Sequence, residues 1–240
     1  MPDHILLLGH RGARRYAPEN TLAAFDLALE HGCDGFEFDV RLTRTRQLVI
    51  CHDPRFKRLP VRRSTLKQLQ ARCLAPKEFP PALPEVFDRY ANRAFLNLEV
   101  KVRGIERLVY RLFSGLRPQR GYFISSFHPS VVREFHRMDG SLVLGTLSQT
   151  RWQLRRWEKL PATYVVPQYR LLSPGLVEEV HAAERLVVTW TVNEPRQMLR
   201  AVELGVDGII SDDTKTLVET LRSGHRVVAS SGQRKPDSVY

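Results

Sequence analysis

Two carboxylates lie two residues apart in an otherwise apolar stretch, GFEFDV, at residues 35–40. If this stretch forms a β-strand, Glu37 and Asp39 project from the same face, because successive side chains of a strand point to opposite sides. Burying two ionised carboxylates is costly unless cations compensate for the lost hydration. The pair therefore predicts a metal site, and the simpler alternative is a solvent-facing strand whose carboxylates pair with arginines.

A histidine follows this strand, in the sequence LVICHD at residues 48–53. Apolar residues on both sides of Thr45-Arg46 predict a β-hairpin, and a tight turn would pair residue 40 with 51 and residue 39 with 52. In that register His52 faces Asp39 across the hairpin. Thr45-Arg46 lacks the Asn-Gly or Asp-Gly chemistry of two-residue turns, so a longer loop is the alternative.

Eight apolar, strand-like runs follow one another along the chain, and amphipathic stretches or longer inserts separate most of them. This alternation predicts a single-domain (β/α)8 TIM barrel, with a hairpin after the second strand and a basic insertion at about 54–82 before the third. A doubly wound sheet is the alternative, but no glycine-rich dinucleotide fingerprint follows the first run. The runs span residues 5–9, 35–40, 95–100, 122–126, 142–146, 163–167, 186–191 and 208–211.

A barrel of this kind carries its catalytic groups at the C-terminal ends of its strands. Polar residues gather at these ends in the sequence, and we therefore expect one active site there. The residues are His10 and Arg11, Glu37 and Asp39, Glu99 and Lys101, Ser125 and Ser126, and Trp190 and Asn193.

The composition is that of a globular protein of 240 residues, with 42% hydrophobic and 26% charged residues. No apolar run approaches the ~20 residues that span a membrane, and the N-terminus, MPDHILLLGHRG, does not resemble a signal peptide. The three cysteines, Cys33, Cys51 and Cys73, have no CxxC spacing. We expect reduced thiols and a cytoplasmic location.

The formal net charge of +11 is unevenly distributed. Residues 55–77 contain eight Lys or Arg and no Asp or Glu, and residues 222–240 form a basic tail that we expect to be disordered, beyond a barrel domain at 1–221. The basic stretch would attract phosphorylated substrates, contact an anionic membrane surface, or be a solvated loop without a role. No RNA-recognition motif accompanies it, so we expect no nucleic-acid partner.

Over nearly its whole length the sequence resembles the glycerophosphodiester phosphodiesterase family, a group of phospholipase C-like TIM barrels. It departs from the family pattern at Thr45-Arg46, at Asp213-Thr214, and in lacking an Arg-Thr-Thr stretch after the His-Asp pair, a change that bears on substrate choice. The motifs that carry the resemblance are GHRGARRYAPENTLAAF (9–25), EFDV (37–40), HD (52–53), LNLEVK (96–101), ISSFHP (124–129), TWTVNEP (189–195) and GVDGIISDD (205–213).

The resemblance implies a role for ten residues of this sequence. The implied metal ligands are Glu37, Asp39 and Glu99, the implied catalytic histidines are His10 and His52, the phosphate-contacting residues are Arg11 and Lys101, Trp190 lies near the glycerol, and Glu19 and Asn20 support the loop after the first strand. Trp190 could instead be a core residue, since burial is the usual role of an aromatic side chain.

These residues predict a metal-dependent phosphoric diester hydrolase. Three carboxylates without a cysteine ligand suit Mg²⁺ or Ca²⁺, and two histidines suit the proton transfers. The resemblance implies hydrolysis of glycerophosphodiesters to glycerol 3-phosphate and an alcohol in phospholipid metabolism, with initial attack by the substrate's own glycerol hydroxyl. The alternatives are a lysophospholipase D and a non-catalytic barrel that binds anions or membranes. The sequence leaves open the headgroup, the metal, the oligomeric state and which histidine is the acid.

Overall fold

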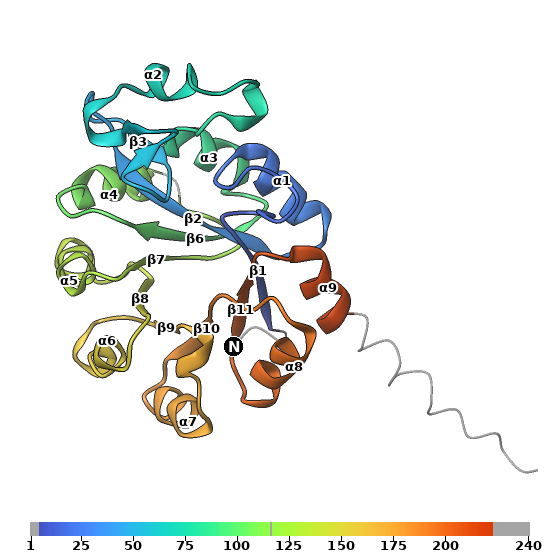
Figure 1. Ribbon diagram of the computed structural model, residues 1–240. Helices are drawn as coiled ribbons and strands as arrows, with labels where there is room; N and C mark the ends of the chain where they lie inside the picture. The colour runs from blue at the N-terminus through green and yellow to red at the C-terminus, as the bar shows by residue number, and fades with distance from the viewer. Residues whose placement is uncertain (1–4, 116, 223–240) are drawn as a thin grey trace, which may run out of the picture.

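Eight parallel strands form a closed barrel in the computed structural model, which describes residues 5–115 and 117–222 (Figure 1). Each strand pairs with its neighbour, and β1 pairs with both β11 and β2, so the barrel is complete. The predicted (β/α)8 fold is confirmed. The strands are β1 (Leu6–His10), β2 (Gly35–Leu42), β6 (Phe95–Val100), β7 (Tyr122–Ser126), β8 (Leu144–Ser148), β9 (Tyr164–Pro167), β10 (Leu186–Thr189) and β11 (Gly208–Ser211).

Helices connect the strands and surround the barrel (Figure 1). None of the helices in the described ranges is both long and apolar enough to cross a lipid bilayer. The predicted tail at 222–240 lies outside the described residues except for Arg222, the last residue of α9. The helices are α1 (Leu22–Glu30), α3 (Leu83–Tyr90), α4 (Glu106–Gly115), α5 (Pro129–Met138), α6 (Arg151–Leu154), α7 (Pro174–Ala182), α8 (Pro195–Glu203) and α9 (Thr214–Arg222).

The predicted hairpin is present, but its predicted register is wrong by one residue. Strand β3 (Leu48–Ile50) is antiparallel to β2, and Val40 pairs with Ile50, not with residue 51. The reason is a longer turn, in which the backbone N–H of Thr43 bonds to the carbonyl of Gln47 and Arg46 has a left-handed φ of 60°. Loops of this kind place one residue in the left-handed region and lengthen the connection.

The predicted insertion folds back on the hairpin as a series of short elements. A small apolar cluster of Val49, Cys51, Val61 and Leu69 joins it to the barrel. Thr65 begins α2 with a capping box closed by Gln68, which satisfies backbone donors at the helix start. The elements are β4 (Arg55–Phe56), β5 (Leu59–Pro60), η1 (Val61–Arg63), α2 (Leu66–Gln70) and η2 (Pro76–Glu78).

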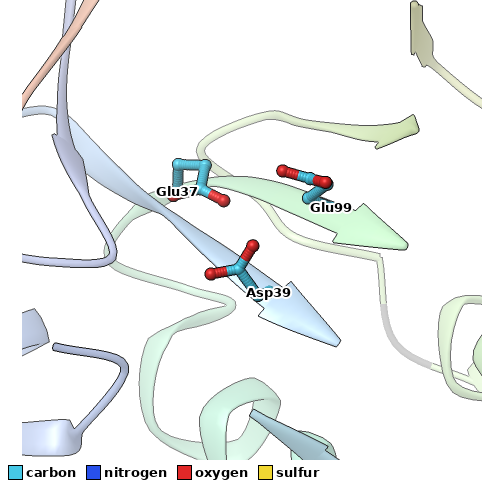
Figure 2. Close-up of side chains that lie close together, drawn as sticks. All are labelled: Glu37, Asp39 and Glu99. Atoms are coloured by element: carbon cyan, nitrogen blue, oxygen red, sulfur yellow. The ribbon is translucent and has the colours of Figure 1, made fainter. Parts of the chain in front are cut away.

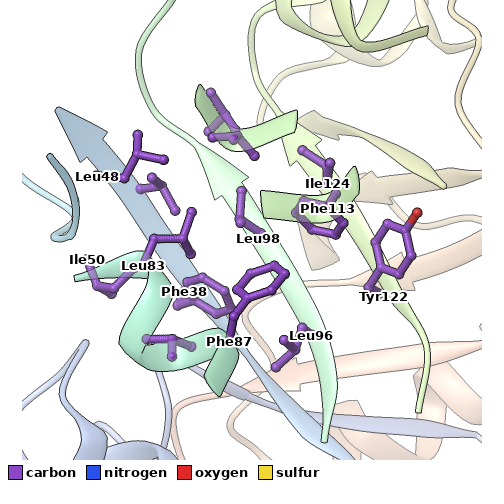
Figure 3. Packing of buried hydrophobic residues seen from close by; sticks show 14 of the residues in the cluster. Phe38, Leu48, Ile50, Leu83, Phe87, Leu96, Leu98, Phe113, Tyr122 and Ile124 are labelled. Carbon is purple, nitrogen blue, oxygen red and sulfur yellow. The ribbon is translucent and has the colours of Figure 1, made fainter. Parts of the chain in front are cut away.

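The main apolar core lies between the outer face of the strands and the helices, as Figure 3 shows for β2, β6 and β7. Phe38 of β2 is fully buried with Leu83 and Phe87 of α3. Along β2, Glu37 and Asp39 alternate with Phe36 and Phe38, which face the helices, and the two carboxylates therefore point into the barrel. The predicted division of the two faces of this strand is confirmed.

Candidate active site

The register of the parallel strands brings three carboxylates together. Asp39 of β2 lies opposite Glu99 of β6, and Glu37 lies one inward-facing position earlier on β2. Gly35 allows this close approach, because a Cβ there would lie 1.8 Å from the carbonyl oxygen of Phe95. All three carboxylates are buried, and one ligand atom of each lies within 4.8 Å of the others (Figure 2). They form a candidate site for a metal ion.

Two cationic side chains flank the carboxylates. Lys101 Nζ lies 2.6 Å from Glu99 Oε1 and 3.4 Å from Asp39 Oδ1. Arg11 Nε lies 3.3 Å from Asp39 Oδ2, and the backbone N–H of Arg11 donates to Glu37 Oε2 at 3.0 Å. Burial alone would lower the pKa of Arg11 and Lys101, but the carboxylates raise the pKa of both above the usual values.

The three carboxyl groups respond differently to this environment. Burial and the charges of Asp39 and Glu99 raise the pKa of Glu37 well above its usual value. Burial and Asp39 also raise the pKa of Glu99, to about 7, although Lys101 partly offsets them. Burial would raise the pKa of Asp39 as well, but Lys101, Arg11 and His52 lower it. Arg11 and Lys101 therefore stabilise the ionised form of Asp39, whereas the charges of Glu37 and Glu99 are poorly compensated.

The geometry fits a cation at this point. Glu37 Oε1 and Asp39 Oδ1 are buried without a hydrogen-bond partner among the described residues. Buried polar atoms without partners are rare, and oxygen atoms in this arrangement match the preference of Mg²⁺ and Ca²⁺. These three residues could therefore hold a hard divalent cation. A strand neutralised by arginines alone, the simpler alternative, would leave these oxygens unsatisfied.

The two predicted supporting residues contact the site from the loop after β1. Asn20 holds Asp39 at two points, since its amide donates to Asp39 Oδ2 at 2.8 Å and its Oδ1 accepts from the Asp39 backbone N–H at 3.2 Å. Glu19 accepts a hydrogen bond of 2.8 Å from Arg11 Nη1. Asn20 therefore orients a carboxylate, and Glu19 orients a guanidinium.

His10 is held by an aspartate that the sequence analysis did not identify. Its Nδ1 donates to Asp212 Oδ1 at 2.6 Å, while its Nε2 lies 3.9 Å from Glu37 Oε2. Asn193 donates to Asp212 Oδ2 and accepts from the Asp212 backbone N–H, both at 2.9 Å. Burial would raise the pKa of Asp212, but His10 and Asn193 lower it to about 2. Asp212 directly follows β11, so the rule that active-site groups follow barrel strands could have found it.

His52 is held in a similar way at the end of the hairpin. Its Nδ1 donates to Asp53 Oδ1 at 2.8 Å, which leaves Nε2 as the nitrogen available to the site. Burial lowers the pKa of His52, and Lys101 and Arg11 lower it further, whereas Asp39 and Asp53 raise it. The backbone N–H of Cys51 bonds to the carbonyl of Asp39 at 2.9 Å, so His52 reaches the site despite the corrected register.

A cavity of about 340 Å³ brings most of the predicted residues together. Its apolar wall includes Trp190, whose indole N–H donates to the Val166 carbonyl at 3.0 Å and whose ring meets Phe127 edge to face. Asn97 also lines the cavity, and its buried Nδ2 has no hydrogen-bond partner among the described residues. The predicted residues that line this cavity are His10, Arg11, Glu37, His52, Glu99, Lys101 and Trp190.

Comparison with known proteins agrees with this geometry. The Glycerophosphoryl diester phosphodiesterase family profile matches residues 10–216. A glycerophosphodiester phosphodiesterase from Caldanaerobacter subterraneus is 34% identical, over 91% of this chain and 98% of that protein. Among solved structures, the glycerophosphodiester phosphodiesterase of Thermotoga maritima has a TM-score of 0.79 at 25% identity and covers 91% of this chain and 99% of its own.

A phosphodiesterase from Oleispira antarctica, solved in complex with the product sn-glycerol-3-phosphate, has a TM-score of 0.79 at 24% identity and covers 90% of this chain and 96% of its own. The barrel and its polar C-terminal face thus define a phosphoric diester hydrolase. The chain belongs to the glycerophosphoryl diester phosphodiesterase family.

Proposed function

We propose that the protein hydrolyses glycerophosphodiesters to glycerol 3-phosphate and an alcohol with the help of a divalent cation, as a step in the breakdown of deacylated phospholipids. The observation that carries the proposal is the buried group of three carboxylates between two cationic side chains, at one cavity with two histidines. The product bound to the Oleispira neighbour and the glycerophosphodiester phosphodiesterase from Caldanaerobacter subterraneus support the same substrate class.

The cation would bind to Glu37, Asp39 and Glu99, and it would be Mg²⁺ or Ca²⁺. When bound, it offsets the negative charge that develops on the phosphate oxygens. Metal binding requires the ionised form of the three carboxylates, which together with Arg11 and Lys101 have a formal charge of −1. A divalent cation changes this charge to +1, which matches a phosphodiester anion.

Arg11 and Lys101 bind the phosphate in this mechanism. Arg11 lines the active-site cavity, and its guanidinium has donors beyond Nε, which lies 3.3 Å from Asp39 Oδ2, and the Nη1 hydrogen bond to Glu19. A guanidinium presents donors in a planar fork that suits phosphate, whereas an ammonium acts as a compact charge. Trp190 supplies an apolar surface on which the glycerol carbons pack.

His10 and His52 carry the protons. One imidazole takes the proton of the attacking hydroxyl as a new P–O bond forms, and the other donates a proton to the alcohol oxygen as its bond to phosphorus breaks. In each residue Nδ1 is bonded to an aspartate, so Nε2 is the atom that exchanges the proton. If the glycerol hydroxyl attacks first, a cyclic phosphate forms, and water then opens it with the two histidines in exchanged roles.

The test is to remove the metal and restore it. We expect EDTA to abolish the release of glycerol 3-phosphate and Mg²⁺ or Ca²⁺ to restore it. Glu99→Gln should weaken metal binding measured by calorimetry, whereas Glu106→Gln should not, because Glu106 is buried at the start of α4 and is not part of the carboxylate group. Full activity in thoroughly chelated protein would contradict the metal-dependent mechanism.

A substrate panel defines the reaction class. Glycerophosphodiesters with several headgroups are compared with the corresponding lysophospholipids, and glycerol 3-phosphate and lysophosphatidate are measured as products. We expect turnover of the deacylated diesters. Turnover of the lysophospholipids alone would favour the lysophospholipase D alternative.

A further inference from the structure

A second cavity, of about 410 Å³, is lined by four arginines and by no aspartate or glutamate. The arginines come from separate parts of the sequence. Arg41 is near the end of β2, Arg46 is in the turn of the hairpin, Arg62 is in η1 of the insertion, and Arg103 follows β6. The fold, not a local run of basic residues, therefore concentrates positive charge in this cavity.

None of these four arginines forms an ion pair with a carboxylate of residues 5–115 or 117–222. Other exposed arginines do, such as Arg117, which lies 2.9 Å from Asp139. Like charges around one cavity repel each other, and a bound anion removes this repulsion. The cavity has the charge and the volume of an anion-binding site.

The cavity adjoins the candidate active site at two points. Arg41 Nε donates to the backbone carbonyl of His52 at 2.7 Å, and Arg103 is two residues beyond Lys101. Both His52 and Lys101 line the active-site cavity. Val102, which directly follows Lys101, also lines the second cavity, so neighbouring residues of one segment line both cavities.

We propose that the arginine cavity binds a phosphate monoester, and that it selects glycerophosphodiesters whose alcohol carries such a phosphate. This choice among substrates rests on the proposed function, the hydrolysis of glycerophosphodiesters. Several guanidinium groups suit a phosphate dianion better than a singly charged carboxylate, because each presents a planar fork to the oxygens. Free inorganic phosphate shares this chemistry.

The test compares two triple variants. The cavity variant carries Arg46→Gln, Arg62→Gln and Arg103→Gln. The control variant carries Arg44→Gln, Arg63→Gln and Arg107→Gln, which are exposed residues of the same segments that do not line the cavity. Both variants lose the same charge, so a difference between them cannot come from general electrostatic attraction.

The two substrates are sn-glycero-3-phosphoglycerol and its derivative with a terminal phosphate on the leaving glycerol. We expect the cavity variant to lose roughly 10- to 100-fold in kcat/KM for the phosphorylated substrate, the effect of a lost hydrogen bond to a charged group. Its kcat/KM for the unphosphorylated substrate should be unchanged, and the control variant should behave as the parent with both. Equal losses in the two variants would overturn the proposal.

Calorimetric titration with inorganic phosphate separates the remaining outcomes. If the parent hydrolyses both substrates equally and only the cavity variant loses a phosphate-binding event, the anion site stands and the headgroup selection is wrong. If no diester is hydrolysed by the parent, the proposed function fails, and the same loss of phosphate binding would still establish the site. Identical phosphate binding by the parent and the cavity variant would overturn the site itself.

Discussion

The two histidines of the site are each bonded to an aspartate, but they belong to different parts of the molecule. His10 and Asp212 come from β1 and the end of β11, where the barrel closes, and we call this the closure side. Their side chains are 12% and 27% exposed. His52 and Asp53 follow the hairpin, and we call this the hairpin side. Their side chains are 31% and 69% exposed.

The difference shows two ways of orienting an imidazole. Asp212 is itself held at two atoms by Asn193, so the closure side is a connected network. Asp53 is mostly exposed and bonds to its neighbour in sequence. A hydrogen bond donated to an exposed carboxylate contributes little, because water competes for the carboxylate and salt screens its charge. We infer that the closure side holds its histidine in place more strongly than the hairpin side does.

The largest expected effect is the loss of either histidine. His10→Ala and His52→Ala should each reduce kcat by roughly 10²–10⁴, the usual effect of losing a general acid or base. Both variants should bind the metal as the parent does, which calorimetry would measure. If either variant turned over at nearly the parent rate, that histidine would not carry a proton in the reaction.

The second prediction separates the two aspartates. Asp212→Asn should reduce kcat by roughly 10- to 100-fold, which corresponds to a lost hydrogen bond between charged groups of about 1.5–3 kcal/mol. Asp53→Asn should reduce kcat by at most about fivefold, because an exposed ion pair contributes no more than about 1 kcal/mol. KM should change little in both, because neither residue contacts the substrate in the proposed mechanism. Equal losses of kcat would remove the distinction between the two sides.

Trp190, which follows β10 and contacts Phe127 and Val166, forms an apolar wall apart from both sides and tests where the glycerol binds. Trp190→Ala should raise KM for glycerol-based diesters by roughly 2- to 10-fold, the contribution of an aromatic contact. Simple aryl phosphodiesters should be affected less, since they lack the glycerol. Steady-state kinetics with both substrate types would measure the difference, and equal changes would indicate that Trp190 is a structural core residue.

The smallest effect concerns the pKa of His52. Burial lowers this pKa below its usual value, and the hydrogen bond to Asp53 raises it in part. Asp53→Asn removes a contribution that raises the pKa, so His52 should lose its proton at a still lower pH. An NMR titration of the ring resonances would measure the change in the metal-free protein. A higher pKa in the variant would contradict this account of the hairpin side.

Much of the barrel could be predicted from periodicity. The strands β6, β7 and β11 begin and end where their apolar runs do. Polar or turn-forming residues mark several of these ends, such as Lys101 after β6, Gly121 before β7 and Asp212 after β11. The helix α3 was not predicted, although its Leu83, Val86, Phe87 and Tyr90 are buried. The helix is only eight residues long, and Pro80, Pro81 and Pro84 obscure where it begins. The hairpin register was missed because it depends on the left-handed φ of Arg46, which the residue type does not indicate.

The sequence alone determined which chemistry was available at the end of each strand, because side-chain alternation and strand polarity are local properties. It therefore placed Glu37 and Asp39 on one face and Glu99 and Lys101 on the next strand. Only the tertiary structure decided which groups meet, because the stagger between parallel strands and the closure of the barrel are set by packing over the whole molecule. The contact of His10 with Asp212, 202 residues away in the chain, depends on that closure. The arginine cavity also depends on tertiary packing, because its four arginines come from four segments of the chain.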